Sequence, residues 1–155
     1  ISACAWAEGE LAVRLSGAAS AVEAARATIG GESLETGAAG RFWLAIREQT
    51  DSFFCSDKPL WRLSVPSVAP PLGLPGEQLI EWGGSQRWLA SNADARTIRE
   101  AAAPAGGHAT LFRAADKSAG VFTPLAPPLG KIHRNLKQAF DPAGVFNPGR
   151  MYPDL

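Results

Sequence analysis

The segment EQLIEWGGSQRWLASN, residues 77–92, is typical of a β-hairpin. Two strand-like runs flank the pair Gly83-Gly84, which can supply the positive φ angles that a tight hairpin turn requires. Trp82 and Trp88 stand on either side of the turn and are predicted to pair across it, with a platform for a cofactor or a partner as the alternative. A hairpin joins its strands in antiparallel order, so this segment favours an antiparallel sheet.

Further strands are predicted on both sides of this hairpin. Apolar and polar residues alternate in residues 10–16 and again in residues 59–66, the pattern of a half-buried strand. The buried faces are expected to be Leu11, Val13 and Leu15 in the first strand and Trp61, Leu63 and Val65 in the second. A strand-like run also opens the chain, and residues 108–114 give a short strand near its end.

Four helices are predicted from apolar spacing and from capping residues. The first covers residues 20–29 and begins with a capping box of Ser20 and Glu23, and the second covers residues 39–49 with Phe42 and Ile46 inward. A third follows Asn92 as its N-cap. The last begins at Pro127-Pro128, with a buried stripe of Leu129, Ile132, Leu136 and Phe140.

The order of these elements predicts the fold class. Two strands precede two helices, and a strand, the hairpin, a helix, a strand and a helix follow. No closely spaced βαβ repeats with Gly-rich turns occur, which argues against a doubly wound parallel sheet. We therefore expect an α+β fold, an antiparallel sheet with helices packed on one face. A doubled strand–helix–strand arrangement, as in ferredoxin-like folds, is one form that this pattern can take.

Length and composition indicate one globular domain, residues 1–155. The 155 residues are 46% hydrophobic and 19% charged, with fifteen basic and fifteen acidic residues, so neither nucleic acid nor an anionic membrane is suggested as a partner. No apolar run reaches the length of a transmembrane helix. Because the chain opens inside a strand-like run, we expect the C-terminal domain of a longer protein. Cys4 and Cys55 are expected to be reduced, buried thiols.

Few residues suggest chemistry. No phosphate-binding glycine loop or nucleophile elbow occurs, and His108 and His133 lie too far apart in sequence to predict a metal site. One row of polar residues is expected on the sheet face opposite the apolar one: Arg14, Arg62, Ser64, Glu81, Arg87, His108 and Thr110.

The substrate-binding candidates in this row are Arg62, Arg87 and His108. Arginines in such a row can hold a small carboxylate by two parallel hydrogen bonds, and a histidine can accept a proton. The alternative is a solvated sheet face, which antiparallel sheets commonly have.

The C-terminal sequence DPAGVFNPGRMYPDL, residues 141–155, combines chain-breaking and apolar residues. Asp141-Pro142 is expected to end the last helix, Gly144 to take a left-handed conformation, and Pro148-Gly149 to form a type II turn. Two turns would fold the tail back, so that Phe146, Met151 and Tyr152 pin it to a surface.

This tail resembles the terminal signature Asp-Pro-x-Gly-x-Phe-Asn-Pro-Gly-Lys/Arg of flavin-dependent oxidoreductases of the vanillyl-alcohol oxidase type. Within that type, it is most similar to the FAD-binding (E) subunits of bacterial glycolate oxidases. Residues 76–89 and 106–114 are also similar to the C-terminal half of these subunits.

The resemblance implies a role in a larger flavoprotein. FAD would be held mainly by an upstream domain, while this domain would cover the flavin and shape the pocket for glycolate or another 2-hydroxy acid. Asn147 and Arg150 would lie on the flavin side of the tail. Electrons would leave through sister subunits, including an iron–sulfur subunit. The complex would be cytoplasmic or peripheral at the inner membrane, and residues 1–155 alone would be inactive.

The chain also departs from catalytic relatives, which carry a His-x-His cluster and a downstream Glu-His pair that are missing here. This departure favours an alternative in which the chain is a non-catalytic module that holds sister subunits together. The basic residues of the last helix, Lys131, Arg134 and Lys137, would then contact a partner instead of solvent. A third reading, an independent small-ligand domain, rests on the Trp-rich hairpin alone.

Overall fold

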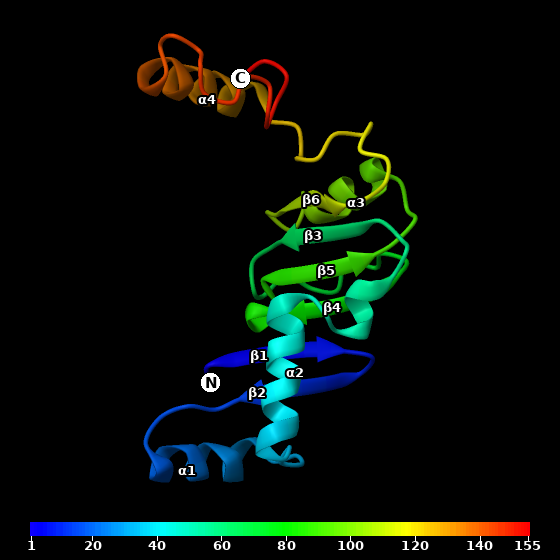
Figure 1. Ribbon diagram of the computed structural model, residues 1–155, viewed down its shortest axis with the longest axis vertical. Coiled ribbons are helices and arrows are strands. Elements are labelled where there is room, and N and C mark those ends of the chain that lie inside the picture. Colours follow the sequence, from blue (N-terminus) through cyan, green and yellow to red (C-terminus); the bar gives the residue numbers. More distant parts are fainter.

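A six-stranded antiparallel sheet forms the centre of the computed structural model, which describes all residues 1–155 (Figure 1). In chain order the strands are β1 (Ala3–Ala7), β2 (Glu10–Arg14), β3 (Leu60–Ser64), β4 (Glu77–Glu81), β5 (Gln86–Ala90) and β6 (His108–Arg113). Their order in the sheet is β2-β1-β4-β5-β3-β6, and every neighbouring pair is antiparallel. The predicted α+β class, with an antiparallel sheet, is confirmed.

Four α-helices connect or follow these strands. They are α1 (Ala19–Ile29), α2 (Thr36–Glu48), α3 (Ala95–Ala102) and α4 (Pro127–Phe140). The chain runs from strand through helix to strand twice, from β2 through α1 and α2 to β3, and from β5 through α3 to β6. The predicted order of all elements is confirmed.

The sheet has a hydrophobic cluster on each face, and each cluster includes one helix. Ile98 and Ala102 of α3 pack with Trp61, Leu63 and Leu89 on one face. On the other face, Ile46 of α2 belongs to the second cluster, which contains Phe54, Leu60, Leu79 and Trp88. The two helices thus lie on opposite faces of the sheet, and the prediction that the helices pack on one face is wrong. Both faces can be buried because β3 and β5 carry apolar residues at consecutive positions.

The hairpin forms as predicted, but its turn is longer than a Gly-Gly pair. A turn of three residues with positive φ, Trp82–Gly84, leads from β4 towards β5, and Trp82 itself has a φ of 53°. Trp82 is therefore part of the turn and 71% exposed, whereas Trp88 is buried and lies opposite Leu79. The predicted pairing of the two indoles is wrong, because only Trp88 belongs to a strand.

Two predicted helix caps and one predicted buried residue differ from the structure. Ala18 occupies the N-cap of α1 without a side-chain hydrogen bond, so the predicted capping box is absent, and no residue of α1 is buried. The N-cap of α3 is Asp94, which accepts from the Thr97 amide, and not Asn92. Leu11, on the edge strand β2, is 64% exposed.

The two thiols also differ from the prediction, since Cys55 is exposed and Cys4 is only half-buried. Both cysteines are free.

Helix α4 forms a separate lobe with the C-terminal tail (Figure 1). Its predicted buried stripe is exposed instead: Leu129, Ile132, Leu136 and Phe140 are all between 48% and 80% accessible to solvent. The periodicity located the apolar side of the helix correctly, but no part of this chain covers it. None of the helices is long and apolar enough to cross a membrane.

Candidate functional site

Four polar side chains lie together on the outer part of one sheet face. In the register of β3 and β6, Arg62 lies opposite Thr110, and Ser64 lies opposite His108. Directly opposite residues in an antiparallel pair have Cβ atoms about 5 Å apart, so the four side chains form one patch. We call Arg62, Ser64, His108 and Thr110 the polar patch.

The polar patch is exposed to solvent, and its side chains have no partner in the chain. Arg62, Ser64 and His108 are exposed and Thr110 is half-exposed, and none of the four side chains makes a hydrogen bond or an ion pair within the chain. Helix α2 crosses in front of β4, β1 and β2, whereas the same side of β3 and β6 carries no helix (Figure 1). The patch thus combines a guanidinium group, two hydroxyls and an imidazole on a rigid, accessible surface.

A network next to the polar patch fixes its border. The Glu81 carboxylate accepts from the Trp88 indole N–H at 2.7 Å and from the Gln86 amide at 3.1 Å. Gln86 lies opposite both Glu81 and Ser64 in the sheet, so it belongs to the same face. Gln86 is not among the polar residues predicted on this face, although the alternation along β5 identifies it.

Arg14 lies on the same face but away from the polar patch, at the other edge of the sheet. Its guanidinium stands over the Trp43 ring of α2 at 5.8 Å, and its Nε donates to the Ser2 hydroxyl. This cation–π contact links the edge strand β2 to α2.

Arg87 lies on the opposite face from the polar patch, which corrects its expected place in the row. It pairs with Ile80 on β4 and with Leu63 on β3. The side chain is only 5% exposed and donates to the backbone carbonyls of Gly84, Pro70 and Ala69. Desolvation lowers the pKa of this guanidinium from its ordinary value. Arg87 therefore cannot act together with Arg62 and His108.

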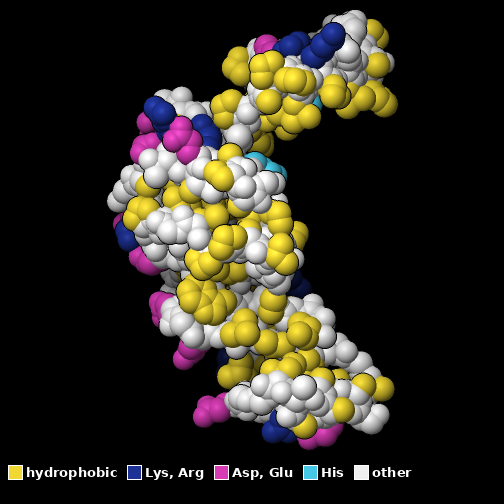
Figure 2. Space-filling model, turned by 180° about the vertical axis from the view of Figure 1, so that it is seen from behind, with side chains coloured by type: hydrophobic (Ala, Val, Ile, Leu, Met, Phe, Trp, Pro, Cys, Tyr) yellow, Lys and Arg dark blue, Asp and Glu magenta, His cyan; other side chains and the backbone are white.

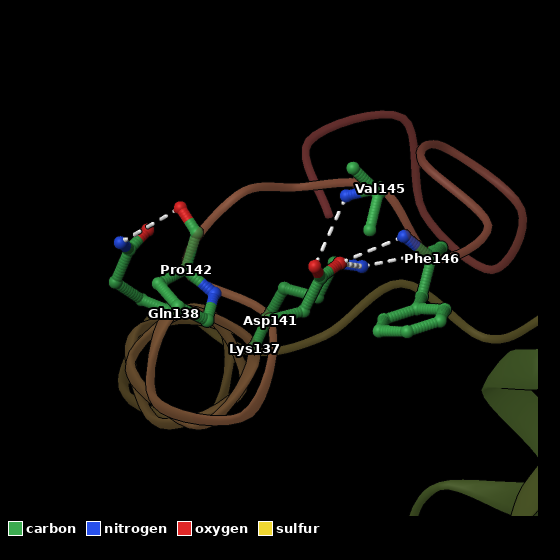
Figure 3. Close-up of polar contacts among 6 residues, drawn as sticks. All are labelled: Lys137, Gln138, Asp141, Pro142, Val145 and Phe146. Atoms are coloured by element: carbon green, nitrogen blue, oxygen red, sulfur yellow. Dashed lines mark hydrogen bonds and ion pairs between the residues drawn. The ribbon is translucent and has the colours of Figure 1, made fainter.

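The C-terminal tail is organised by one carboxylate, that of Asp141 (Figure 3). Asp141 follows the last residue of α4 and accepts from the Lys137 ammonium at 2.5 Å and from the amides of Val145 and Phe146 at 3.0 and 2.9 Å. The bond from Lys137 is the main cause that lowers the pKa of Asp141, and the two backbone amides contribute further. The predicted helix end at Asp141-Pro142 is confirmed.

The predicted turns of the tail are also confirmed. Gly144 has a φ of 63° and Gly149 a φ of 66°, and the Arg150 amide donates to the Asn147 carbonyl as a type II turn over Pro148-Gly149 requires. The tail folds back on the lobe, where the Tyr152 hydroxyl donates to the Thr123 carbonyl.

Of the three apolar residues expected to anchor the tail, only Tyr152 is packed within the chain. Phe146 and Met151 are more than half exposed. Of the basic residues of α4, Arg134 is paired with Asp154 and Lys137 with Asp141, which leaves Lys131 without an acidic partner.

The described residues do not fit a complete site for FAD. The exposed Asn147 and Arg150 lie in the tail turn and present one amide and one guanidinium at the surface. The sequence contains no Gly-rich loop with the spacing that cradles a pyrophosphate in nucleotide sites. No group of three or more His, Cys, Asp or Glu side chains could hold a metal ion.

The fold and the site together define an α+β domain with an open polar patch and a helix, α4, whose apolar side no part of this chain covers. Over its whole length the chain is 50% identical to the C-terminal part of glycolate oxidase subunit GlcE of Escherichia coli strain K12. The match covers 42% of that protein, so the chain spans less than half the length of this curated relative. No family model and no solved structure matches the chain.

Proposed function

We propose that this chain is the C-terminal domain of an FAD-dependent glycolate oxidase subunit, where it covers the flavin and shapes the substrate pocket. The identity to GlcE over all 155 residues supports the assignment to such a subunit. The observation that carries the pocket assignment is the polar patch, because its four functional groups have no partner in the chain. FAD, held mainly by an upstream part of the protein, supplies the two-electron acceptor for oxidation of a 2-hydroxy acid.

The polar patch offers the groups that a small 2-hydroxy acid needs. The Arg62 guanidinium binds the substrate carboxylate by two parallel hydrogen bonds, which also fix its orientation. The hydroxyls of Ser64 and Thr110 flank this position. His108, directly opposite Ser64, accepts the proton of the substrate 2-hydroxyl as glycolate becomes glyoxylate.

The apolar side of α4 docks the domain onto the flavin-holding part of the same protein. Seven large apolar residues of the lobe are at least 48% exposed: Leu129, Ile132, Leu136, Phe140, Val145, Phe146 and Met151. An apolar surface of this extent on one small lobe marks an interaction site. Asn147 and Arg150 belong to the same tail and would lie on its flavin side.

Kinetics of glycolate oxidation by the assembled enzyme test the pocket. Arg62→Ala should raise KM for glycolate about 10- to 100-fold, because a hydrogen bond to a charged group contributes about 1.5–3 kcal/mol. His108→Ala should lower kcat about 100-fold or more if the imidazole is the proton acceptor. The matched control is Arg96→Ala, an exposed arginine on α3 paired only with Glu100. Unchanged kinetics in both patch variants would refute the pocket.

The exposed apolar stripe of α4 also favours a second function, a non-catalytic module that holds sister subunits together. Such a subunit would belong to a complex with an iron–sulfur subunit, on the cytoplasmic side and peripheral to the inner membrane. Ile132→Glu distinguishes the two functions, since Ile132 is 59% exposed in the stripe. Loss of FAD from an otherwise intact complex supports docking onto the flavin-holding part. Dissociation of the complex with full FAD content supports the interaction module.

A further inference from the structure

A groove of about 650 Å³ lies on the sheet face opposite the polar patch. Side chains of Trp6, Ile80 and Arg87 line it from the sheet, and Ala69 and Pro71 line it from the loop that follows β3. Figure 2 shows the molecule from this side, with hydrophobic side chains gathered over the sheet. The proposed function leaves this groove without a role.

The guanidinium of Arg87 retains donor capacity in this groove. Arginine carries five N–H groups, and three of them donate to carbonyls, from Nε to Gly84 at 3.0 Å, from one terminal nitrogen to Pro70 at 2.8 Å and from the other to Ala69 at 2.5 Å. Two N–H groups, one on each terminal nitrogen, have no partner in the protein. Gly84 and Ala69 also line the groove, which places the guanidinium at its wall.

The positive charge of Arg87 also lacks a counter-charge. No carboxylate of the chain lies within 4 Å of the guanidinium, although Arg87 is only 5% exposed. Of the two acidic residues that line the groove, Glu77 is paired with Lys58 at 2.8 Å, and Glu8 is exposed in the turn between β1 and β2. A buried charge that is compensated only by backbone dipoles favours binding of an anion beside it.

We propose that the groove binds a small organic carboxylate with a planar, apolar body. The carboxylate accepts from the two free N–H groups of Arg87, and the body lies on the 38% exposed Trp6 ring and on Ile80. A charged donor pair and an aromatic wall are the features that orient such a ligand in a mostly apolar pocket. The site is separate from the proposed glycolate pocket, because the two lie on opposite faces of the sheet.

Calorimetric titration of the full-length protein with phenylacetate tests the site, with two comparison ligands. Phenylacetamide has the same ring without the negative charge, and inorganic phosphate has the charge without the ring. Each is expected to bind at least about tenfold more weakly than phenylacetate, since each loses either the charged hydrogen bonds or the aromatic contact. Equal affinities for phenylacetate and phenylacetamide, or no phenylacetate binding, would overturn the proposal.

Two variants locate the binding. Gln78→Glu adds a negative charge to the groove and should weaken phenylacetate binding at least about tenfold. Its matched control is Gln138→Glu on α4, because both glutamine amides make only a 3.4 Å bond to a carbonyl four residues away. Trp6→Ala should weaken phenylacetate binding without affecting phosphate. Equal weakening by Gln78→Glu and Gln138→Glu would place the ligand elsewhere and exclude the groove.

Discussion

Replacement of Arg87 by alanine should loosen the loop between β3 and β4 without unfolding the sheet. Arg87 is the only side chain that bonds the carbonyls of both Ala69 and Pro70. The substitution removes three charge-assisted hydrogen bonds, each worth about 1.5–3 kcal/mol when made. Water can reach the freed carbonyls through the groove, so we expect a net loss of about 3 kcal/mol in the local opening free energy.

Amide hydrogen exchange in the full-length protein measures this loss directly. The useful probes are the Ala69 amide, which donates to Pro66 at 2.9 Å, and the Val65 amide, which donates to Ser85 at 3.0 Å. A loss of about 3 kcal/mol corresponds to exchange about 100-fold faster at both amides. Arg87→Lys should give a smaller acceleration than Arg87→Ala, because the ammonium can keep some of these hydrogen bonds. It cannot keep all of them, since one ammonium cannot reach three carbonyls in the same geometry.

The reasoning about Arg87 would be refuted by exchange that accelerates less than about threefold in Arg87→Ala. The same conclusion would follow if the control Arg96→Ala accelerated exchange at Ala69 equally. Either result would show that the loop is held by its own turns and prolines.

Two further predictions concern the tail and the hairpin. Because the pKa of Asp141 is lowered in the folded protein, its stabilising contribution is present above the ordinary carboxyl pKa of about 3.9 and is lost as pH falls through the folded pKa. The protection factors of the Val145 and Phe146 amides, which correct for the intrinsic pH dependence of exchange, should therefore fall below about pH 4. Asp141→Asn should show the low protection factors already at pH 7. Protection factors in the original protein that do not change with pH would be the contrary result. Trp88→Ala should lower the free energy of unfolding, measured by thermal denaturation, by about 3–5 kcal/mol. Trp82→Ala should change it by less than about 0.5 kcal/mol, since only Trp88 is buried. Equal effects of the two substitutions would contradict the observed turn.

The strands and the central hairpin could be predicted from the sequence because alternation reports directly on the pleat of a sheet. Trp61, Leu63 and Val65 are buried as the pattern of β3 predicts, while Arg62 and Ser64 face outward. Alternation along β5 places Arg87 on the face opposite to Gln86, and Gln86 shares its face with Glu81 across the hairpin. The position of Arg87 on the opposite face is therefore predictable from the sequence.

Other features depend on contacts that no local pattern records. The apolar spacing of α4 identifies one side of the helix, but not whether this chain or another surface covers it. The conformation of Trp82 depends on the whole turn, and the burial of Arg87 depends on a loop that approaches the sheet closely. Gly84 permits this approach, because a Cβ there would stand 2.9 Å from the Ser67 carbonyl oxygen in this loop.

The shared face of the polar patch residues could be predicted from the sequence, but their proximity could not. Arg62 and His108 were expected on one face, and the β3–β6 register brings them to neighbouring positions. Their proximity depends on β6 pairing with β3, a contact between strands that are more than 40 residues apart in the chain. A substrate role for them remains a prediction that the kinetics above examine.

Titration with FAD, followed by flavin fluorescence, tests most directly whether this domain covers a flavin that another part of the protein holds. Residues 1–155 and the full-length protein should be titrated in parallel, with circular dichroism confirming that residues 1–155 retain their sheet. The proposed function predicts saturable binding by the full-length protein and no binding by the folded domain alone. Tight, stoichiometric FAD binding by residues 1–155 would contradict it and would place the cofactor site within this domain.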